Sequence, residues 1–221
     1  CESAHPDLLL ATDPDADRVG IAVPHEGSYH LLTGNEVGVL LTDYACRVRA
    51  ARGEDLSQGV VVTTIVSSSM TDALARSRGF QLRRTLTGFK HIGGQTALLA
   101  QAGAPQRYLM GFEESYGYLA GTHVRDKDAV SACSLLAEIC AYAKDQGKTL
   151  YDLLMDIYLE YGFSKEFTVN VVRPGKSGAD EIKAMMTRFR ENPPTELGGS
   201  KVVLWKDYQT LEQKAADGTV T

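Results

Sequence analysis

Several features that would assign a sequence to a specialised class of protein are missing from these 221 residues. No apolar run approaches the roughly 20 residues that a membrane-spanning helix needs, and the first residues do not resemble a signal peptide. A formal net charge of −5 argues against a nucleic-acid-binding surface as the main role of the chain. We therefore expect neither a membrane nor a nucleic acid among its partners.

The four cysteines, Cys1, Cys46, Cys133 and Cys140, show no CxxC spacing. Cys133 and Cys140 lie within one helical pattern, which favours small apolar core residues. A reducing, cytoplasmic location fits this usage best. The chain begins at Cys1 rather than Met, in a segment of internal character, so we expect a piece of a longer protein.

What the sequence does contain is an alternation of apolar strands and helical stretches, the pattern of α/β proteins. The length allows one large or two modest domains. We expect Asn35 to cap a helix that runs through Tyr44. Further strands are predicted at 59–66, 80–86 and 107–112, and further helices at 92–102, 128–146 and 149–161. The serines at 67–69 are expected to cap another helix that runs towards Arg78.

Domain boundaries are expected where the composition changes. The polar stretch 49–58 contains a glycine and separates the first segment from a middle unit of the size of one small α/β domain. In the tail, 167–172 alternates like a half-buried strand, 178–190 has a helical pattern, and 201–205 is a further candidate strand. Two strands and one helix are few for independent stability, so we interpret the tail as the beginning of an incomplete domain.

The first candidate site is an aspartate-rich loop between the apolar runs 8–11 and 19–23, which both have the composition of buried strands. Asp13, Asp15 and Asp17 alternate, so in an extended segment their side chains point to one side. Carboxylates this close repel one another unless protons or a cation intervene, and oxygen ligands suit Mg²⁺. The glycine and glutamate that an EF-hand requires are absent. A solvated acidic turn is the alternative, but the tight strand–loop–strand setting favours a metal.

Three more loops follow predicted strands, where α/β domains gather their ligand groups. In Thr87–Lys90, Gly88 permits close backbone approach and Lys90 offers a charge for a phosphate or a sugar hydroxyl. The alternative is a plain turn with Lys90 in solvent.

In 111–118, Glu113 and its acidic neighbour follow an apolar strand, where sugar hydroxyls could satisfy the carboxylates and Ser115 could add a contact. The alternative is the first turn of a helix, where acids are favoured by the dipole.

The third loop, 125–128, alternates basic and acidic residues before a predicted helix. Such alternation is common on a solvated surface. Near a phosphoryl-transfer centre, however, Lys127 could assist proton transfer or neutralise phosphate charge. The motif alone does not decide between these interpretations.

Taken together, the segments ATDPDADR, TGNE, TGFK, FEESYGY and RDKDA occur in an order and spacing that resembles the α-D-phosphohexomutase superfamily, most closely the bacterial phosphoglucomutases/phosphomannomutases. The resemblance runs from about Pro6 to Phe163 and more weakly through the NPP segment. It implies phosphoglucomutase-type α/β/α domains with mixed sheets. We expect 1–58 to be the C-terminal part of a second domain with the metal-binding loop, 59–163 to be a third, sugar-recognising domain, and 164–221 to be the truncated start of a fourth.

The resemblance also implies roles for individual residues. Asp13, Asp15 and Asp17 match three aspartate ligands of Mg²⁺, and Arg18 matches the arginine beside them. Glu113 and Ser115 match residues that bind sugar hydroxyls, and Lys127 matches a lysine with an acid–base or charge-stabilising role. Gly88 and Lys90 match the loop that lines the third domain's side of the cleft.

The implied reaction interconverts glucose 1-phosphate and glucose 6-phosphate, or the mannose equivalents, through an enzyme phosphoserine and a bisphosphorylated sugar, with glucose 1,6-bisphosphate as activator. No serine here lies in the family's phosphoserine context, and the fourth domain's phosphate-binding loop is also missing. We therefore expect hexose phosphates and the missing domains as partners, and no turnover by this chain alone.

Two alternatives come from other functional classes. One is a non-catalytic module that binds a metal or a sugar phosphate. The other is a HAD-like phosphatase, because such enzymes use an aspartate pair directly after a strand, and Asp13 and Asp15 fit this loosely. The phosphatase interpretation leaves the FEESYGY and RDKD segments unexplained.

Overall fold

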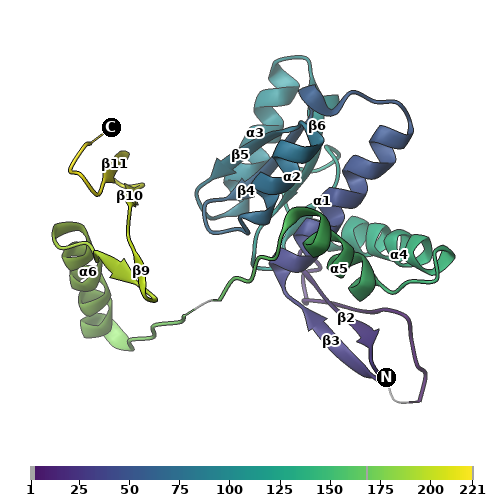
Figure 1. Ribbon diagram of the computed structural model, residues 1–221, viewed down its shortest axis with the longest axis horizontal. Coiled ribbons are helices and arrows are strands. Elements are labelled where there is room, and N and C mark those ends of the chain that lie inside the picture. Colours follow the sequence, from purple (N-terminus) through teal and green to yellow (C-terminus); the bar gives the residue numbers. More distant parts are fainter. Residues whose placement is uncertain (1–2, 168, 221) are drawn as a thin grey trace. The chain divides into compact units, whose positions relative to one another are not determined.

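A computed structural model describes residues 3–167 and 169–220 and divides the chain into two compact units, one up to Glu166 and one from Phe167 onward. Both units are drawn in Figure 1, and each is described here by itself. Helices alternate with mixed sheets in the first unit, which confirms the expected α/β class. In the described part of the chain, no helix is long and apolar enough to cross a membrane.

The first unit opens with an antiparallel sheet of three strands, β1 (Leu9–Thr12), β2 (Val19–His25) and β3 (Ser28–Leu32), with β2 in the middle. As expected, the first half of β2 is buried. The prediction that β1 is also buried is wrong, because three of its four residues are exposed. β1 is an edge strand whose only described ladder partner is β2, so its apolar side chains have little to pack against.

Helix α1 (Gly34–Ala51) begins two residues before the position expected from an Asn35 cap. Thr33 is the actual N-cap: its hydroxyl accepts from the amide of Glu36, while the Glu36 carboxylate accepts from the amide of Thr33. This reciprocal pair is a capping box. Asn35 is buried inside the first turn, and its side-chain oxygen accepts from the amide of Ser68 instead.

The second sheet of the first unit has the strand order β5-β4-β6-β7. Strands β4 (Val60–Thr64), β5 (Gln81–Thr85) and β6 (Tyr108–Phe112) are parallel, and β7 (Tyr118–Leu119) returns antiparallel to β6. The crossovers are α2 (Met70–Arg78) and α3 (Phe89–Gln101), with short 3₁₀ turns at Leu56–Gln58 and Pro105–Arg107. Because the three parallel strands run the same way, the loops that follow them meet at one edge of the sheet.

Helices α4 (Ala129–Asp145) and α5 (Leu150–Tyr161) complete the unit and confirm both predicted helices. The main core lies where α1 packs against β6 and the α4–α5 pair. Gly38 of α1 lies so close to the Phe112 ring that an added Cβ would come within 2.2 Å of it. This close approach seats α1 directly on β6 and so fixes the loop that follows β6.

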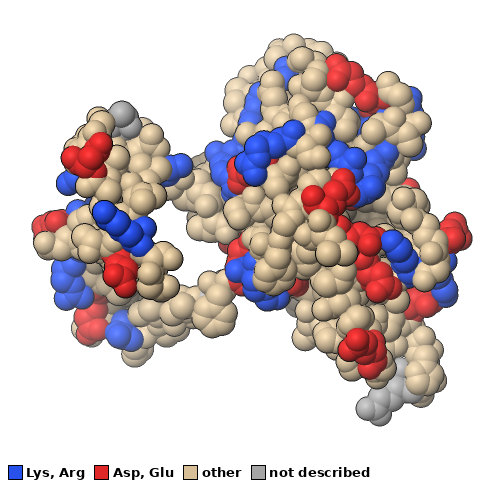
Figure 2. Space-filling view, viewed as in Figure 1, with Lys and Arg blue, Asp and Glu red and all other residues tan. Residues whose placement is uncertain are grey.

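A charged cluster ties α1, α2 and α5 together beside this core. The Asp43 carboxylate, only 4% exposed, accepts from the guanidinium groups of Arg47 and Arg78. Both arginines also reach Glu160 of α5. On the face drawn in Figure 2, patches of basic and of acidic side chains lie among many uncharged residues.

The second unit contains α6 (Gly175–Glu191) and two small antiparallel pairs, β8 (Glu196–Leu197) with β9 (Ser200–Lys201) and β10 (Leu204–Asp207) with β11 (Glu212–Ala215). The predicted helix is present, and the strand expected at 201–205 is displaced towards β10. The predicted strand at 167–172 is wrong for its described residues, 167 and 169–172. Alternation alone does not make a strand without a ladder partner, and Phe167 is 90% exposed.

Candidate active site

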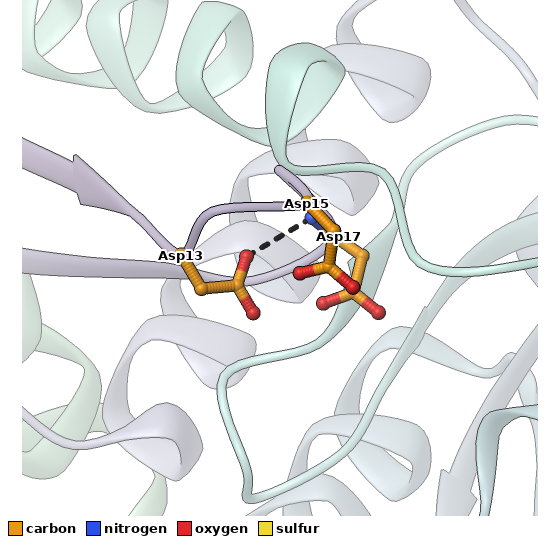
Figure 3. A group of neighbouring side chains, drawn as sticks. All are labelled: Asp13, Asp15 and Asp17. Atoms are coloured by element: carbon orange, nitrogen blue, oxygen red, sulfur yellow. Dashed lines mark hydrogen bonds between the residues drawn. The ribbon is translucent and has the colours of Figure 1, made fainter.

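The aspartate loop connects β1 to β2 and brings its three carboxylates together (Figure 3). One carboxylate oxygen from each of Asp13, Asp15 and Asp17 lies within 4.8 Å of the others. The segment is not extended, as the sequence interpretation assumed: it is a turn in which Ala16 adopts a left-handed φ of 55°. The convergence therefore comes from the turn rather than from the alternation of an extended strand.

Hydrogen bonds to Asp13 hold this turn in shape. One oxygen of its carboxylate accepts from the amides of Asp17 and Arg18, both at 3.1 Å. The hydrogen bond from the Arg18 amide contributes most to lowering the pKa of the Asp13 carboxyl; burial opposes it, and the hydrogen bond from the Asp17 amide lowers the pKa further. Asp13 is thus a carboxylate at neutral pH, as a metal ligand must be.

The residues of the turn fit a hard divalent cation. Their donors are all carboxylate oxygens, the ligand type that Mg²⁺ prefers. Asp17 supplies a further observation, because its Oδ1 is buried and has no hydrogen-bond partner in the described part of the chain. A buried carboxylate oxygen without a partner is costly, and a bound cation would remove that cost.

The other oxygen of Asp17 meets Lys127, which lies far along the chain in the loop before α4. Lys127 Nζ is 2.9 Å from Asp17 Oδ2 and 3.1 Å from an Asp126 oxygen. Partial burial opposes the charge on Lys127, but its hydrogen bonds to these two acids outweigh burial and raise its pKa. Lys127 is therefore a fixed positive charge beside the aspartate turn.

Gly117 and Phe89 make room for that lysine. A Cβ on Gly117 would lie 2.4 Å from Lys127 Cδ, so only glycine lets the side chain pass. Lys127 Nζ also lies 5.5 Å from the centre of the Phe89 ring, at the start of α3. Neither residue was singled out from the sequence, because their role depends on contacts between segments distant in the chain.

The loop after β6 packs directly against the aspartate turn. The Val19 amide donates to the carbonyl of Tyr116, and Arg18 forms an isolated bridge with Gly117. The side chain of Arg18 is about half exposed and reaches within 4.0 Å of Asp13. The expected metal loop and the expected sugar loop are therefore adjacent in the first unit.

Glu113 lies at the end of β6 and is only 5% exposed. One of its carboxylate oxygens accepts from the amide of Gly88 at 2.7 Å, which joins the loops after β5 and β6. The Glu113 amide donates to the Gly117 carbonyl, which closes a tight turn between β6 and β7. Glu113 therefore does not lie in the first turn of a helix. No donor from the described residues contacts the second carboxylate oxygen.

The other predicted residues lie nearby with fewer contacts. Ser115 is partly buried within the same turn. Gly88, at a φ of 108°, is the N-cap of α3, and Lys90 is exposed in its first turn. The helix begins three residues earlier than predicted, so the TGFK segment is a helix start rather than a free loop. Lys90 thus lies near the positive end of the α3 dipole.

Asp128 differs in role from its neighbour Asp126. It is the N-cap of α4, accepting from the amides of Val130 and Ser131. Its second oxygen pairs with His123 at 2.8 Å. The RDKD segment is therefore divided: Lys127 and Asp126 lie at the candidate site, while Asp128 starts a helix.

The sequence is similar to that of a known protein family. A family model described as phosphoglucomutase/phosphomannomutase, alpha/beta/alpha domain III, matches residues 33–161. A phosphoglucomutase of Staphylococcus aureus (strain bovine RF122 / ET3-1) is 39% identical over 219 residues, 99% of this chain. This chain belongs to the phosphoglucomutase/phosphomannomutase family. The phosphoglucomutase of strain MRSA252 is 38% identical over the same length.

Solved structures agree with this family assignment. A putative phosphomannomutase from Thermus thermophilus is 26% identical, with a TM-score of 0.58 over 73% of this chain and 32% of that one. The open form of pp63/parafusin (phosphoglucomutase) from Paramecium is 20% identical, with a TM-score of 0.61 over 98% of this chain and 34% of that one. The second likeness shows the fold alone. The α/β/α fold expected of the family is confirmed.

The chain spans 38% of the length of the curated relatives it matches. The match to the third-domain family model starts at residue 33, at the cap of α1, whereas the third domain was expected to start at residue 59. The expected divisions at 58/59 and 163/164 stay predictions.

Proposed function

We propose that this chain is part of a hexose-phosphate mutase that interconverts glucose 1-phosphate and glucose 6-phosphate, or the mannose phosphates, through an enzyme phosphoserine and a bisphosphorylated sugar. One observation carries the proposal: Lys127, 2.9 Å from Asp17, joins the aspartate turn to the loops expected to bind the sugar. Family membership supports the same reaction class.

Each residue has a task in this proposal. Asp13, Asp15 and Asp17 would hold Mg²⁺, which when bound polarises phosphoryl oxygens and offsets their charge. Lys127 keeps a positive charge beside the phosphoryl group and holds a proton at Nζ that it can donate to the leaving oxygen. Arg18, about half exposed, adds a second charge near Asp13.

The sugar would be bound by the loops after β5 and β6. The Gly88 amide occupies one oxygen of Glu113, which leaves the other to accept from a sugar hydroxyl. Ser115 can add a hydroxyl contact, and Lys90 lies at the start of α3, where an anionic group is favoured. Little covalent work is left to these residues, because phosphoryl transfer depends mainly on positioning and charge.

We propose that the phosphoserine and the phosphate-binding loop belong to other parts of the parent protein, since the chain covers 38% of the relatives' length. In that case the isolated chain does not turn over substrate, and the missing domains are its necessary partners. Glucose 1,6-bisphosphate would act as the activator of the whole enzyme. We also propose a reducing cytoplasmic location, in keeping with the free thiols of Cys46, Cys133 and Cys140.

A kinetic assay of the full-length parent tests the proposal. We expect conversion of glucose 1-phosphate to the 6-phosphate that requires only a catalytic amount of glucose 1,6-bisphosphate, and no conversion by the 221-residue chain alone. Competition between glucose and mannose 1-phosphates would give the sugar preference. Release of free phosphate without isomerisation would favour a phosphatase, and binding without turnover by the parent would favour a non-catalytic module.

A further inference from the structure

Glu114 lies between Glu113 and Ser115 but makes contacts of another kind. Its carboxylate accepts a hydrogen bond of 3.0 Å from the hydroxyl of Thr64, at the end of β4. Thr64 is fully buried, and Ser67, whose hydroxyl is 2.9 Å from that of Thr64, is 7% exposed. Glu114 thus joins the loop after β6 to the buried end of the neighbouring strand.

The hydroxyl groups of this network donate their hydrogen bonds in one direction, from Ser67 through Thr64 to Glu114. The Thr64 hydroxyl donates its proton to the Glu114 carboxylate, so its oxygen can only accept from Ser67. The hydroxyl of Ser67 must then donate to Thr64 Oγ1, while its own oxygen accepts from the Thr64 amide at 3.2 Å. Hydrogen bonds aligned in one direction reinforce one another, which makes the end of β4 a firm anchor.

The turn that carries this anchor is itself held from two sides. The Arg84 guanidinium donates to the carbonyls of Thr64, Ser67 and Ser68. The Ser68 amide donates to the side chain of Asn35 in α1. The position of the Thr64 hydroxyl is therefore determined by β5 and α1 as well as by β4.

The backbone of Glu114 is restrained too. A Cβ on Gly34 would lie only 2.1 Å from the Glu114 carbonyl oxygen, so the first residue of α1 packs tightly against this loop. Tyr118, just after the loop, directs its hydroxyl to the carbonyl of Gly34 at 3.4 Å. The side chain of Glu114 is thus held by a hydrogen bond from β4, and its backbone packs against α1.

We infer that Glu114 is a positioning residue for sugar recognition: by binding Thr64 it fixes the loop so that the free oxygen of Glu113 and the hydroxyl of Ser115 meet the sugar at set positions. This inference rests on the proposed function. Thr64 and Glu114 would then help the enzyme to distinguish sugars by their hydroxyl groups, although neither residue contacts the sugar.

The test uses the full-length parent with Thr64→Val, which removes the donor but keeps the shape, and with Thr64→Ser, which keeps the donor. Activity is measured with glucose 1-phosphate and with the mono-deoxy analogue that the wild-type enzyme disfavours most. For Thr64→Val we expect kcat/KM for glucose 1-phosphate to fall about tenfold, mainly through KM, and the discrimination against the deoxy analogue to shrink by a similar factor. Thr64→Ser should restore both.

Thr63→Val is the matched control. Thr63 lies next to Thr64 in β4 and is equally buried, but its hydroxyl has no hydrogen-bond partner among the described residues. The same substitution there should leave both kinetic quantities unchanged. Glu114→Leu, which removes the acceptor instead of the donor, serves as a second variant if Thr64→Val folds poorly.

The outcomes separate the inference from the proposed function. Reduced discrimination in Thr64→Val or Glu114→Leu, with rescue by Thr64→Ser, supports a positioning role. An equal loss with both substrates overturns it, because a smaller folded fraction lowers both activities alike. A wild-type parent without mutase activity overturns the proposed function and this inference together.

Discussion

At the scale of single residues, two neighbouring threonines of β4 use a buried hydroxyl in opposite ways. Thr64 donates to Glu114 and belongs to a hydrogen-bond network, whereas the hydroxyl of Thr63 is buried and without a partner in the described chain. A buried hydroxyl without a partner loses its hydrogen bonds to water and gains none in the protein, which destabilises the folded state. The two positions therefore allow the same substitution to be compared in one strand.

We predict that Thr63→Val raises the free energy of unfolding by about 1 kcal/mol, because valine has the same shape and removes the unsatisfied group. Thr64→Val should lower it by a similar amount of about 1 kcal/mol, since it leaves Glu114 without its donor. Urea unfolding of the chain, followed by circular dichroism, measures both. A loss of stability in Thr63→Val would contradict this account of β4.

Asp128 gives a prediction about pH. Its hydrogen bond with His123 lowers the pKa of its carboxyl, burial opposes this, and the amides of Ser131 and Val130 lower it further. A carboxyl whose folded pKa lies below the unfolded value of about 3.9 adds stability that is fully present above that pH and is lost as the pH falls through the folded pKa. Asp128→Asn, which can still cap α4, should weaken this acid sensitivity.

The measurement is the melting temperature of wild type and Asp128→Asn between about pH 2 and pH 6, the range in which carboxyls titrate. The difference between the two proteins should narrow towards the acid end. A constant difference over the whole range would contradict the assignment of a lowered pKa to Asp128.

The sequence singled out Glu113, Ser115 and Lys127 because they stand in recognisable motifs. It offered no means of seeing that Lys127 meets Asp17, or that Glu114 meets Thr64, since these pairs lie far apart in the chain and come together only through the fold. Gly117 likewise gains its importance from the lysine that passes over it. Motifs predicted the candidate residues, and tertiary contacts determine which of them lie together.

At the scale of elements, α3 contains two adjacent glycines with different surroundings. Gly93 is buried, and a Cβ there would lie 2.1 Å from the carbonyl of Arg125, in the loop that carries Lys127. Gly94 is exposed, and a Cβ there would meet nothing within 4 Å. The first glycine lets the loop approach the helix, and the second only weakens the helix.

We predict that Gly94→Ala stabilises the protein by about 0.5–1 kcal/mol through helix propensity alone. Gly93→Ala should destabilise it by about 2 kcal/mol or more, because a backbone carbonyl must move. Thermal unfolding of the two variants compares them under one set of conditions. Equal effects would show that the close approach of the Arg125 loop is not needed for stability.

Elements with strong periodicity, α4 and α5, could be predicted from the sequence almost to the residue. The failures have a common cause. The apolar run in β1 and the alternating segment 167–172 indicated burial, but β1 is an exposed edge strand and the described part of 167–172 lacks a ladder partner. Burial depends on neighbours that local pattern does not reveal.

At the scale of the whole molecule, the predicted α/β class and family hold, and the chain spans 38% of its relatives' length. We predict that the isolated chain binds Mg²⁺ weakly, because three carboxylates leave the coordination incomplete. Titration calorimetry should show weak Mg²⁺ binding to the unaltered chain and none to Asp15→Asn. Asp55→Asn, a control substitution far along the chain, should leave the binding unchanged. Tight binding unchanged by Asp15→Asn would contradict a site at this turn.

The central claim is that this chain supplies the metal-binding and sugar-binding loops of a hexose-phosphate mutase. Phosphorus NMR of the full-length parent with glucose 1-phosphate, Mg²⁺ and a trace of glucose 1,6-bisphosphate follows sugar phosphates and inorganic phosphate in one sample. We predict that glucose 6-phosphate accumulates while total sugar phosphate stays constant, and that Lys127→Met slows this at least tenfold, as expected for loss of a charged group at the reacting centre. Growth of the inorganic phosphate signal without glucose 6-phosphate would contradict the claim.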